Sequence, residues 1–464
     1  MSNQACDMVR DYLFRQGAVG RGAMQPDCVN LADLTTKGTR ETEYTNPLDW
    51  GGLRAQGSEE PKKTVPGLQI EGYFSDEPSR TTSNPGNPHG KRNKDGSKLY
   101  PHDSQFVIRF PDPEYWEGRL VIAGAPGVRG QYANDIIIGD HVLQKGCAFA
   151  STDKGNSGLR FYSASQGPGD AVAEWHRRIN QLARIVKEAA KAYYGNHGKE
   201  LKYTYITGNS NGGYLTRYAL ENDREGLYNG GVDWQGTLFT DPDGPNSDPD
   251  KGPNMFTFLP SALKHYLSPL RTARAAMVEA GFELDQEFLW EFYYTVYWNL
   301  VQRIYREEFD PYYFGPDADY NYAERINPLK NLSGKAAADA IKGAVKRVSL
   351  TGDIKKPLIT LHGTLDALFP IKKSADKYAE LVKNAGHEKM HRYYRIEGGT
   401  HVDSLYNSFP KKLRPMLPCY KAAFDRLVEW VESEGKMLPP DSQTIPKPTE
   451  GDVVNSCPEL KKQE

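Results

Sequence analysis

The sequence contains no long apolar run and no excess of charge of one sign. No window approaches the roughly 18 consecutive apolar residues that a membrane-spanning helix requires, so we expect no transmembrane segment. Lysine and arginine total 58 against 60 aspartates and glutamates, which gives a formal net charge of −2. This balance gives no electrostatic reason to expect binding to nucleic acid or to an anionic membrane. We also find no internal repeat.

The first residues, 1–7, contain no apolar signal region. We therefore expect either a cytoplasmic protein or a mature secreted form with an added methionine. A chain of 464 residues can form one large domain with an insertion or two ordinary domains. Its 38% hydrophobic and 11% aromatic residues are enough for a sizeable core.

The chain has only five cysteines, and their spacings do not resemble a zinc site. Cys6 and Cys28 lie close in sequence, as do Cys419 and Cys457, so two disulfides are conceivable. Cys147 lies within an apolar strand pattern, where a buried free thiol is the simplest interpretation. The cysteines therefore leave the redox compartment open.

A nucleophile elbow is the clearest motif in the chain. Residues 202–207 are β-branched and aromatic, residues 214–220 favour a helix, and between them residues 208–212 read Gly-Asn-Ser-Asn-Gly, a Gly-x-Ser-x-Gly pattern. A turn from strand to helix within one residue strains the serine backbone, and the glycines on either side lack the Cβ atoms that would clash. We predict that Ser210 is a nucleophile at the C-terminal edge of a sheet.

Strand and helix patterns alternate around this elbow, which predicts a mostly parallel sheet with helices on both faces. Apolar residues recur every three or four positions over 171–194 and 419–432, so these segments are expected to be helices. The expected strands cover 104–110, 118–124, 146–152, 202–207, 230–234, 357–362 and 391–396.

Two further residues complete a candidate catalytic triad. Asp366 and His401 follow the predicted strands 357–362 and 391–396, in the order nucleophile, acid, base that this arrangement requires. His401 would accept the Ser210 proton, and Asp366 would fix the tautomer of its ring. Glu397 and Asp403 are competing carboxylates, but they are too close to His401 in sequence to reach its far nitrogen readily.

The stretch between Ser210 and Asp366 is more than twice as long as the roughly 60 residues that two β–α units need. We therefore expect an inserted helical lid that shapes the pocket and excludes water. The predicted organisation is an N-terminal extension packed on the body (1–100), including a polar surface loop near 78–104, a core (101–245 and 350–436), the lid (246–349) and a surface tail (437–464).

Aromatic residues are so dense over 288–305 that they cover every side of a helix, so some must face another layer or a ligand. Trp290, Tyr294 and Trp298 are spaced by four and are our candidates for substrate contact; ordinary core packing is the alternative. Because the sheet already supplies the reacting groups, we expect the lid to set substrate choice rather than chemistry.

Backbone amides next to the elbow are candidates for an oxyanion hole. The Asn211 N–H begins a helix and can stabilise an oxyanion. The small-residue loop 124–130 lies where such sheets supply a second donor, which would be Ala125, Gly127 or a near neighbour because Pro126 has no N–H. A plain tight turn is the alternative for this loop.

The acidic run 241–250 carries oxygen side chains at alternate positions, as calcium loops do. The candidate ligands are Asp241, Asp243, Asn246 and Asp248. The run lacks the bidentate glutamate at the twelfth position, and its prolines suit a solvated acidic loop instead. We predict no metal and no cofactor for the chemistry, with calcium as the alternative.

Three segments resemble α/β-hydrolases of the group that includes 3-hydroxybutyrate oligomer hydrolases, tannases and feruloyl esterases. They are Gly-Cys-Ala-Phe-Ala-Ser-Thr-Asp-Lys-Gly at 146–155, Ala-Tyr-Tyr-Gly at 192–195 and the elbow with its flanks at 206–214. The resemblance covers 105–235 well and 355–405 more loosely. It implies the α/β-hydrolase fold and the cleavage of carboxylic esters.

Within this group the tannases carry a disulfide between cysteines beside the catalytic serine and histidine. Asn209 and Val402 occupy those places here, which favours the oligomer hydrolases. We therefore predict a serine hydrolase that acts through an acyl-enzyme on small-molecule or oligomeric esters, of the 3-hydroxybutyrate type or bulky and aromatic.

Two other functions remain open. Residues 210–213 and 362–366 also resemble the catalytic domain of prolyl-oligopeptidase peptidases, but the hundred or so residues before the core cannot build the β-propeller of those enzymes. A hydrolase-shaped binding protein without activity is the third class, and the intact triad argues against it. The acyl group, the leaving alcohol and the oligomeric state are not specified by the sequence.

Overall fold

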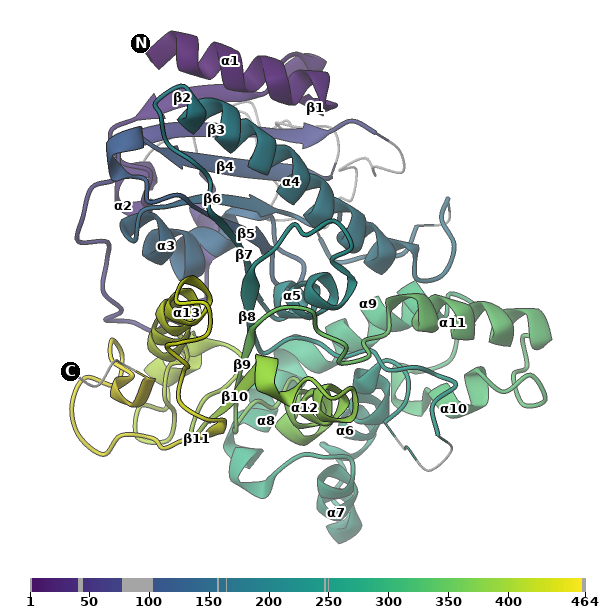
Figure 1. The fold of residues 1–464 in the computed structure, drawn as a ribbon. Helices are drawn as coiled ribbons and strands as arrows, with labels where there is room; N and C mark the ends of the chain where they lie inside the picture. Colours follow the sequence, from purple (N-terminus) through teal and green to yellow (C-terminus); the bar gives the residue numbers. More distant parts are fainter. Residues whose placement is uncertain are drawn as a thin grey trace.

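An eleven-stranded sheet runs through the protein (Figure 1). The computed structural model describes residues 2–40, 45–76, 103–156, 158–163, 165–245, 248 and 250–460. In spatial order the strands are β1 (Ala18–Val19), β3 (Gly67–Phe74), β4 (Gln105–Pro111), β6 (Cys147–Thr152), β5 (Arg119–Gly124), β7 (Tyr203–Asn209), β8 (Gly230–Trp234), β9 (Leu358–Gly363), β10 (His391–Ile396) and β11 (Gln443–Ile445), with β2 (Asp27–Leu31) paired to β3.

The strands from β6 to β11 pair in parallel, whereas β1 to β4 pair antiparallel and β4 joins β6 antiparallel. The predicted parallel sheet is therefore confirmed, and every strand predicted from residue 104 onward is present within one or two residues. In a parallel sheet the carboxyl ends of the strands share one edge, so the loops that follow β5, β7, β9 and β10 meet there.

Helices cover both faces of the sheet. Along β5, Leu120 and Ile122 point into one core and Val121 and Ala123 into the other, because successive side chains of a strand alternate. The helices that cover the first core are α1 (Ser2–Arg15), α4 (Asp170–Gly195), α5 (Asn211–Asn222) and α12 (Ala375–Asn384). The helices that cover the second core are α3 (Asp140–Gln144) and α13 (Leu417–Glu432). The short α2 (Thr36–Thr39) is hydrogen-bonded to α3.

The predicted insertion consists of helices. They are α6 (Leu259–His265), α7 (Arg271–Glu279), α8 (Glu287–Tyr293), α9 (Asn299–Phe309), α10 (Tyr322–Arg325) and α11 (Lys335–Val348). A π-helical turn, Tyr294–Trp298, joins α8 to α9. The segment is bonded to the loops after β9 and β10: Trp298 donates to the Ala367 carbonyl at 2.8 Å, and the hydroxyls of Tyr293 and Thr400 are 2.8 Å apart.

The N-terminal region is more than the extension that the sequence predicts, because it contributes β1, β2 and β3 to the sheet. In β3, Leu68 and Ile70 enter the first core, while the polar Gln69 lies on the opposite face and is also buried. Gln69 accepts a hydrogen bond from Arg109 of β4 at 2.8 Å. The alternation of apolar and polar residues over 68–71 is a strand signal, but in the structure both faces of β3 are buried, because its polar residues have buried partners. The predicted surface loop 78–104 lies almost wholly outside the described residues.

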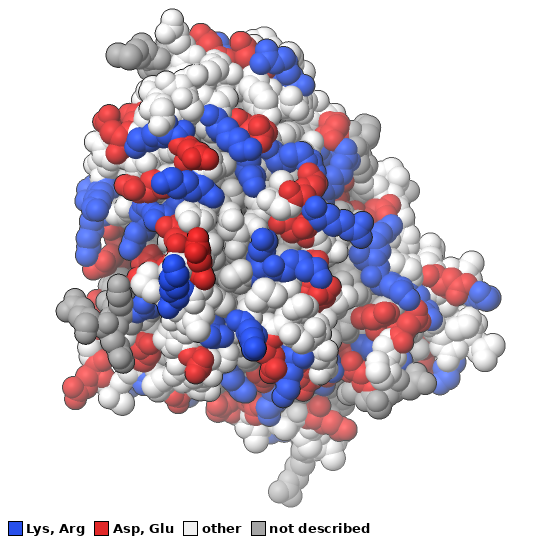
Figure 2. Space-filling view, viewed as in Figure 1, with Lys and Arg blue, Asp and Glu red and all other residues white. Residues whose placement is uncertain are grey.

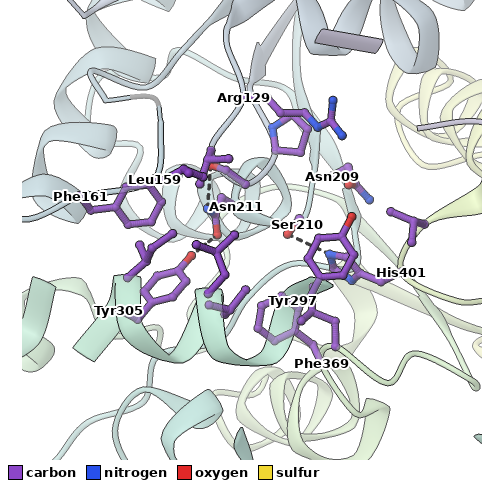
Figure 3. Close-up of a pocket in the computed structure, with 18 of the residues that line it drawn as sticks. Arg129, Leu159, Phe161, Asn209, Ser210, Asn211, Tyr297, Tyr305, Phe369 and His401 are labelled. Atoms are coloured by element: carbon purple, nitrogen blue, oxygen red, sulfur yellow. Dashed lines mark hydrogen bonds between the residues drawn. The ribbon is translucent and has the colours of Figure 1, made fainter. Parts of the chain in front are cut away.

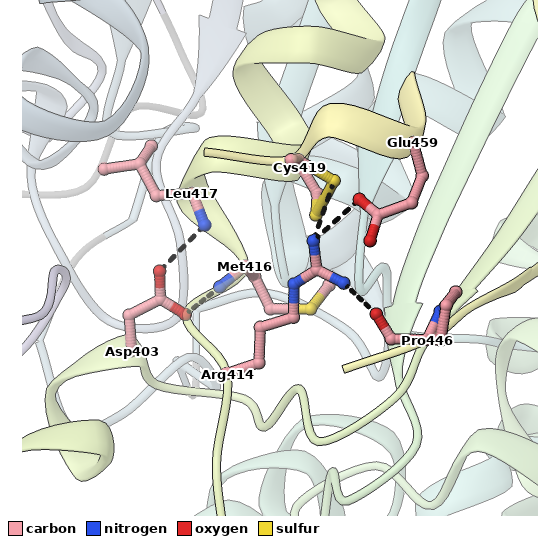
Figure 4. Close-up of a disulfide and its surroundings, with 8 residues drawn as sticks. Asp403, Arg414, Met416, Leu417, Cys419, Pro446 and Glu459 are labelled. Carbon is pink, nitrogen blue, oxygen red and sulfur yellow. Dashed lines mark hydrogen bonds and ion pairs between the residues drawn. A yellow bond between two sulfur atoms is a disulfide. The ribbon is translucent and has the colours of Figure 1, made fainter. Parts of the chain in front are cut away.

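The C-terminal tail also departs from the prediction, because it is anchored rather than laid on the surface. β11 adds to β10 in parallel, and Ile445 and Leu460 are fully buried. The disulfide Cys419–Cys457 ties the tail to α13, and the buried Arg414 donates to the Pro446 carbonyl at 2.6 Å beside it (Figure 4).

Both conceivable disulfides are formed, since Cys6 is also joined to Cys28, and Cys147 is a buried free thiol as predicted. On the face drawn in Figure 2, positive and negative side chains are interspersed, in keeping with the net charge of −2. No helix among the described residues combines the length and hydropathy needed to cross a membrane.

The Cys419–Cys457 bridge should stabilise the fold, because it closes a loop between residues 38 positions apart and so restricts the unfolded chain. We expect Cys457→Ser to lower the free energy of unfolding by about 2–4 kcal/mol in urea denaturation. A reductant should destabilise the parent at least as much but change the Cys28→Ser/Cys457→Ser double variant little. Equal stability of parent and Cys457→Ser would contradict this role.

Candidate active site

The elbow has the strained geometry that the sequence predicts. Ser210 lies between β7 and α5 with φ 56° and ψ −115°, a conformation that non-glycine residues rarely adopt. A Cβ on Gly208 would lie 2.4 Å from the carbonyl carbon of Gly212, and a Cβ on Gly212 would lie 2.3 Å from the Gly124 carbonyl oxygen. The two glycines therefore allow α5 to approach β7 and β5 closely enough to present the serine.

Ser210, His401 and Asp366 form one hydrogen-bonded chain, although they come from three loops. The Ser210 hydroxyl lies 3.1 Å from His401 Nε2, and His401 Nδ1 lies 2.8 Å from Asp366 Oδ2. The residues follow β7, β10 and β9, whose carboxyl ends share one edge of the sheet. This arrangement can move the serine proton to the histidine ring while the carboxylate holds that ring.

The Asp366 carboxylate is fully buried and fully hydrogen-bonded. Its Oδ1 accepts from the amides of Leu368 and Phe369 at 2.8 and 2.9 Å, and its Oδ2 faces His401 and, at 3.3 Å, His362 Nε2. Burial alone raises the pKa of the Asp366 carboxyl, but the two histidines that face it lower that pKa well below its usual range. The acid is therefore ionised at neutral pH.

Neighbouring groups hold the His401 ring in place. Its ring packs edge-on against Phe369 with centroids 5.1 Å apart. The preceding residue, Thr400, accepts a bond at its carbonyl from Gln235 at 3.1 Å and shares one at its hydroxyl with Tyr293 of α8. The histidine loop is thus fixed both by the sheet and by the inserted helices.

Of the three predicted oxyanion donors, the structure leaves two available. The Ala125 amide donates to the Thr152 carbonyl at 2.9 Å, because Ala125 continues the pairing of β5 with β6; Ala125 is therefore excluded. Within the described part of the chain, the Asn211 and Gly127 amides donate to no protein acceptor, and both residues line the pocket beside Ser210.

Ser210 opens into a cavity of about 260 Å³. Figure 3 shows Ser210 and Asn211 near its centre, with Phe161 and Tyr305 on one side and His401 on the other. Its lining is mostly apolar: Leu53, Pro126, Val128, Leu159, Phe161, Leu300, Val301, Ile304, Leu368, Phe369 and Val402. Such a cavity excludes water from the serine and suits an apolar substrate group.

Solved structures of two esterases have a similar architecture. Feruloyl esterase B from Aspergillus oryzae superposes with a TM-score of 0.55 over 94% of this chain and 91% of its own, at 12% identity. An esterase, also from Aspergillus oryzae, gives 0.53 over 94% and 90%, at 13% identity. The protein has the α/β-hydrolase fold.

A family model of the 3HB-oligomer hydrolases matches residues 315–461, about a third of the chain. The matched segment contains Asp366 and His401 but not Ser210. No curated protein sequence matches. The resemblance to the oligomer-hydrolase and feruloyl esterase group is thus supported in the last third by sequence and over nearly the whole chain by fold.

The three aromatic residues predicted to contact substrate do not line the pocket of this hydrolase fold. Trp290 and Trp298 are buried in the core, where Trp298 bonds the Ala367 carbonyl, and Tyr294 packs on Tyr266 at 4.9 Å. The three residues still lie together, since Phe282 packs on both Trp290 and Trp298 and Tyr266 packs on both Tyr294 and Trp298. The wider π-helical turn Tyr294–Trp298 rotates α9, so a different set of residues faces the cavity.

The residues of the insertion that do line the pocket are Tyr297, Leu300, Val301, Ile304 and Tyr305. Tyr297, Val301 and Tyr305 have the same spacing by four as the predicted trio. The sequence therefore contains this second set of residues spaced by four, but nothing in the residues alone shows the turn at which the helix changes face.

The competing carboxylates have other partners. Asp403 accepts from the amides of Met416 and Leu417 at 2.7 and 2.9 Å and so holds the start of α13 (Figure 4). Glu397 is exposed and accepts from the Lys447 amide at 3.1 Å. Of the three carboxylates, Asp366 is the one that lies in hydrogen-bond contact with the His401 ring.

The candidate calcium ligands do not converge. Asp243 pairs with Lys342 and Lys346 at 2.5 and 3.0 Å, and Asp248 pairs with Lys377 at 3.2 Å. Asp241 accepts from the Asp243 amide, and Asn246 lies outside the described residues. Asp243 and Asp248 are thus paired with lysines rather than with each other, as in an acidic surface loop.

Asp403 should act on stability, since without its carboxylate two buried amides at the start of α13 lose their acceptor. We expect Asp403→Ala to lower the free energy of unfolding by about 1–3 kcal/mol, measured by urea denaturation. Glu397→Ala, at an exposed position on the same loop, should stay within about 0.5 kcal/mol of the parent. Similar values for the two variants would rule out the capping role.

Proposed function

We propose that the protein is a serine hydrolase that cleaves carboxylic esters through an acyl-enzyme, with Ser210 as nucleophile, His401 as general base and Asp366 as orienting acid. The observation that carries this proposal is the unbroken hydrogen-bonded chain of these three side chains at a strained elbow, opening into an apolar cavity. The esterases of the same fold and the oligomer-hydrolase family match support it.

The proposed reaction has two halves. Ser210 Oγ attacks the ester carbonyl carbon as His401 Nε2 takes the hydroxyl proton, and the oxyanion that forms is bound by the amides of Asn211 and Gly127. The tetrahedral intermediate expels the alcohol, which receives the proton from His401, and leaves an acyl-Ser210. A water molecule then gives its proton to His401, attacks the acyl group and releases the acid, restoring Ser210.

The substrate class that fits best is an ester with a bulky apolar acyl group or an oligomeric hydroxyacid of the 3-hydroxybutyrate type. A cavity of about 260 Å³ accommodates more than an acetyl group. Its walls are mostly aliphatic and aromatic, and the phenol of Tyr297 and the amide of Asn209 add scattered polar groups. The family match to 3HB-oligomer hydrolases favours the oligomeric ester.

We also propose that residues 246–349 are a lid on a core formed by 101–245 and 350–436. Helix α9 and the π-helical turn before it supply one wall of the cavity. Trp298 of that turn bonds the loop after β9 and Tyr293 of α8 bonds the loop after β10, and these bonds keep the wall over Ser210. A wall supplied by an insertion determines which acyl or alcohol groups fit.

The triad should fail as a unit. We expect Ser210→Ala to lower kcat for a p-nitrophenyl ester by about 10⁴-fold or more. His401→Ala and Asp366→Ala should each lower kcat nearly as much, and the losses should not add when the substitutions are combined. Asp403→Ala should keep kcat within a few-fold. A fluorophosphonate probe should label Ser210, as read by mass spectrometry of the intact and digested protein.

An active Ser210→Ala variant, or a label on another residue, would remove this mechanism. The same assays should include hydroxybutyrate oligomers, feruloyl and galloyl esters and peptides. Faster cleavage of peptides than of esters would favour the prolyl-oligopeptidase-like alternative.

The pocket wall should select substrate size. We expect Ile304→Ala to raise KM for a bulky ester by about tenfold, since a lost apolar contact of this size is worth roughly 1–2 kcal/mol. Turnover of an acetate ester should change little, because that substrate is too small to reach the wall. Equal loss on both esters would show that Ile304 is needed for the fold rather than for substrate fit.

A further inference from the structure

The side chain of Asn211, the residue after the proposed nucleophile, connects three parts of the protein. Its Nδ2 lies 3.2 Å from the Gly127 carbonyl, which can only accept, so the amide nitrogen must face Gly127. Its Oδ1 then accepts from the Tyr305 hydroxyl of α9 and from Thr237 Oγ1 at 3.3 Å. Figure 3 shows this chain running from Tyr305 through Asn211 to the loop after β5.

Gly127 needs such support. It has φ +48°, and a Cβ at its position would meet nothing within 4 Å, so no neighbouring atom packs against that side of the residue. Its carbonyl receives a second bond from the buried Lys154 ammonium at 3.3 Å. This carbonyl shares a rigid peptide plane with the Val128 amide, so the two donors hold that plane. The preceding plane, which contains the Gly127 amide, is held by the bond from the Arg129 amide to the Pro126 carbonyl at 3.0 Å, and the two planes meet at Gly127. The Gly127 amide is one of the two available oxyanion donors.

We propose that the Asn211 side chain is a clamp through which α9 holds the oxyanion loop, and that Tyr305 is a positioning residue for catalysis. This inference rests on the proposed function and changes one part of it. The sequence suggests that the insertion sets substrate choice alone. The clamp instead links the position of α9 against the core to the orientation of an oxyanion donor, and therefore to kcat.

The hydroxyl of Tyr305 can be tested apart from its ring. The ring packs against Phe161 and Phe239 with centroids 5.5 and 6.0 Å away, contacts that a phenylalanine retains. Tyr305→Phe therefore keeps the ring contacts and removes only the hydroxyl, with its bonds to Asn211 and Thr237. Asn211→Ala removes the clamp itself but keeps the backbone amide and suits the first turn of a helix.

Loss of a whole oxyanion donor lowers kcat by about 10²–10³-fold, so a loosened donor should cost less. We expect Tyr305→Phe to lower kcat by about tenfold and Asn211→Ala by about 10- to 100-fold, equally on an acetate and a bulky p-nitrophenyl ester, with KM within about threefold. The double variant should match Asn211→Ala, because the two residues act in series.

Tyr313→Phe is the matched control. It removes a phenol hydroxyl from the same insertion, one that donates to the Pro316 carbonyl at 2.9 Å, and it should leave kcat and KM unchanged. Thermal unfolding of each variant checks that the fold is intact. Unchanged kcat in folded Tyr305→Phe and Asn211→Ala, additive losses, or a rise in KM confined to the bulky ester would each overturn the clamp.

Parent turnover and labelling of Ser210 by a fluorophosphonate report separately on the proposed function. A parent that hydrolyses esters while Tyr305→Phe retains its kcat removes the clamp alone. A parent that neither hydrolyses esters nor takes the label removes both proposals.

Discussion

The close backbone approach at the elbow is the constraint on which the rest of the site depends. Gly208, Gly212 and Gly124 allow the first turn of α5 to lie against the ends of β7 and β5. This contact fixes Ser210 in its strained conformation and places the Asn211 amide beside it. It also brings the loop after β5 within reach of the Asn211 side chain, so Ser210 and this loop are positioned by the same packing.

The second requirement is a buried charge that is stabilised before any substrate binds. The Asp366 carboxylate receives two backbone amides and faces two histidines, which offsets the cost of removing it from water. A carboxylate 2.8 Å from His401 Nδ1 favours the tautomer that carries its proton on that nitrogen. The inserted helices contribute here too, since Tyr293 bonds the residue that precedes His401. The neighbours of Asp366 and His401 in the chain, Ala367 and Thr400, are thus both hydrogen-bonded to helical residues between β8 and β9.

The insertion also explains where the pocket lies. A regular α-helix through residues 290–305 would keep residues spaced by four on one face, but the π-helical turn before α9 shifts that face. Trp290 and Trp298 consequently pack in the core, and Val301 and Tyr305 face Ser210. Turns of this kind are common at functional sites because they reorient side chains without breaking the helix.

The sequence by itself determined the elbow, the parallel core and the order of Ser210, Asp366 and His401, because these depend on local patterns: glycine spacing, strand and helix periods, and residues at strand ends. Tertiary structure decided what depends on partners distant in the chain. Both faces of β3 are buried because Gln69 pairs with Arg109, and β11 exists because it adds to β10. Ala125 is excluded as an oxyanion donor because its amide pairs with Thr152. The side of α9 that faces the pocket depends on the π-helical turn before it, which no residue pattern predicts.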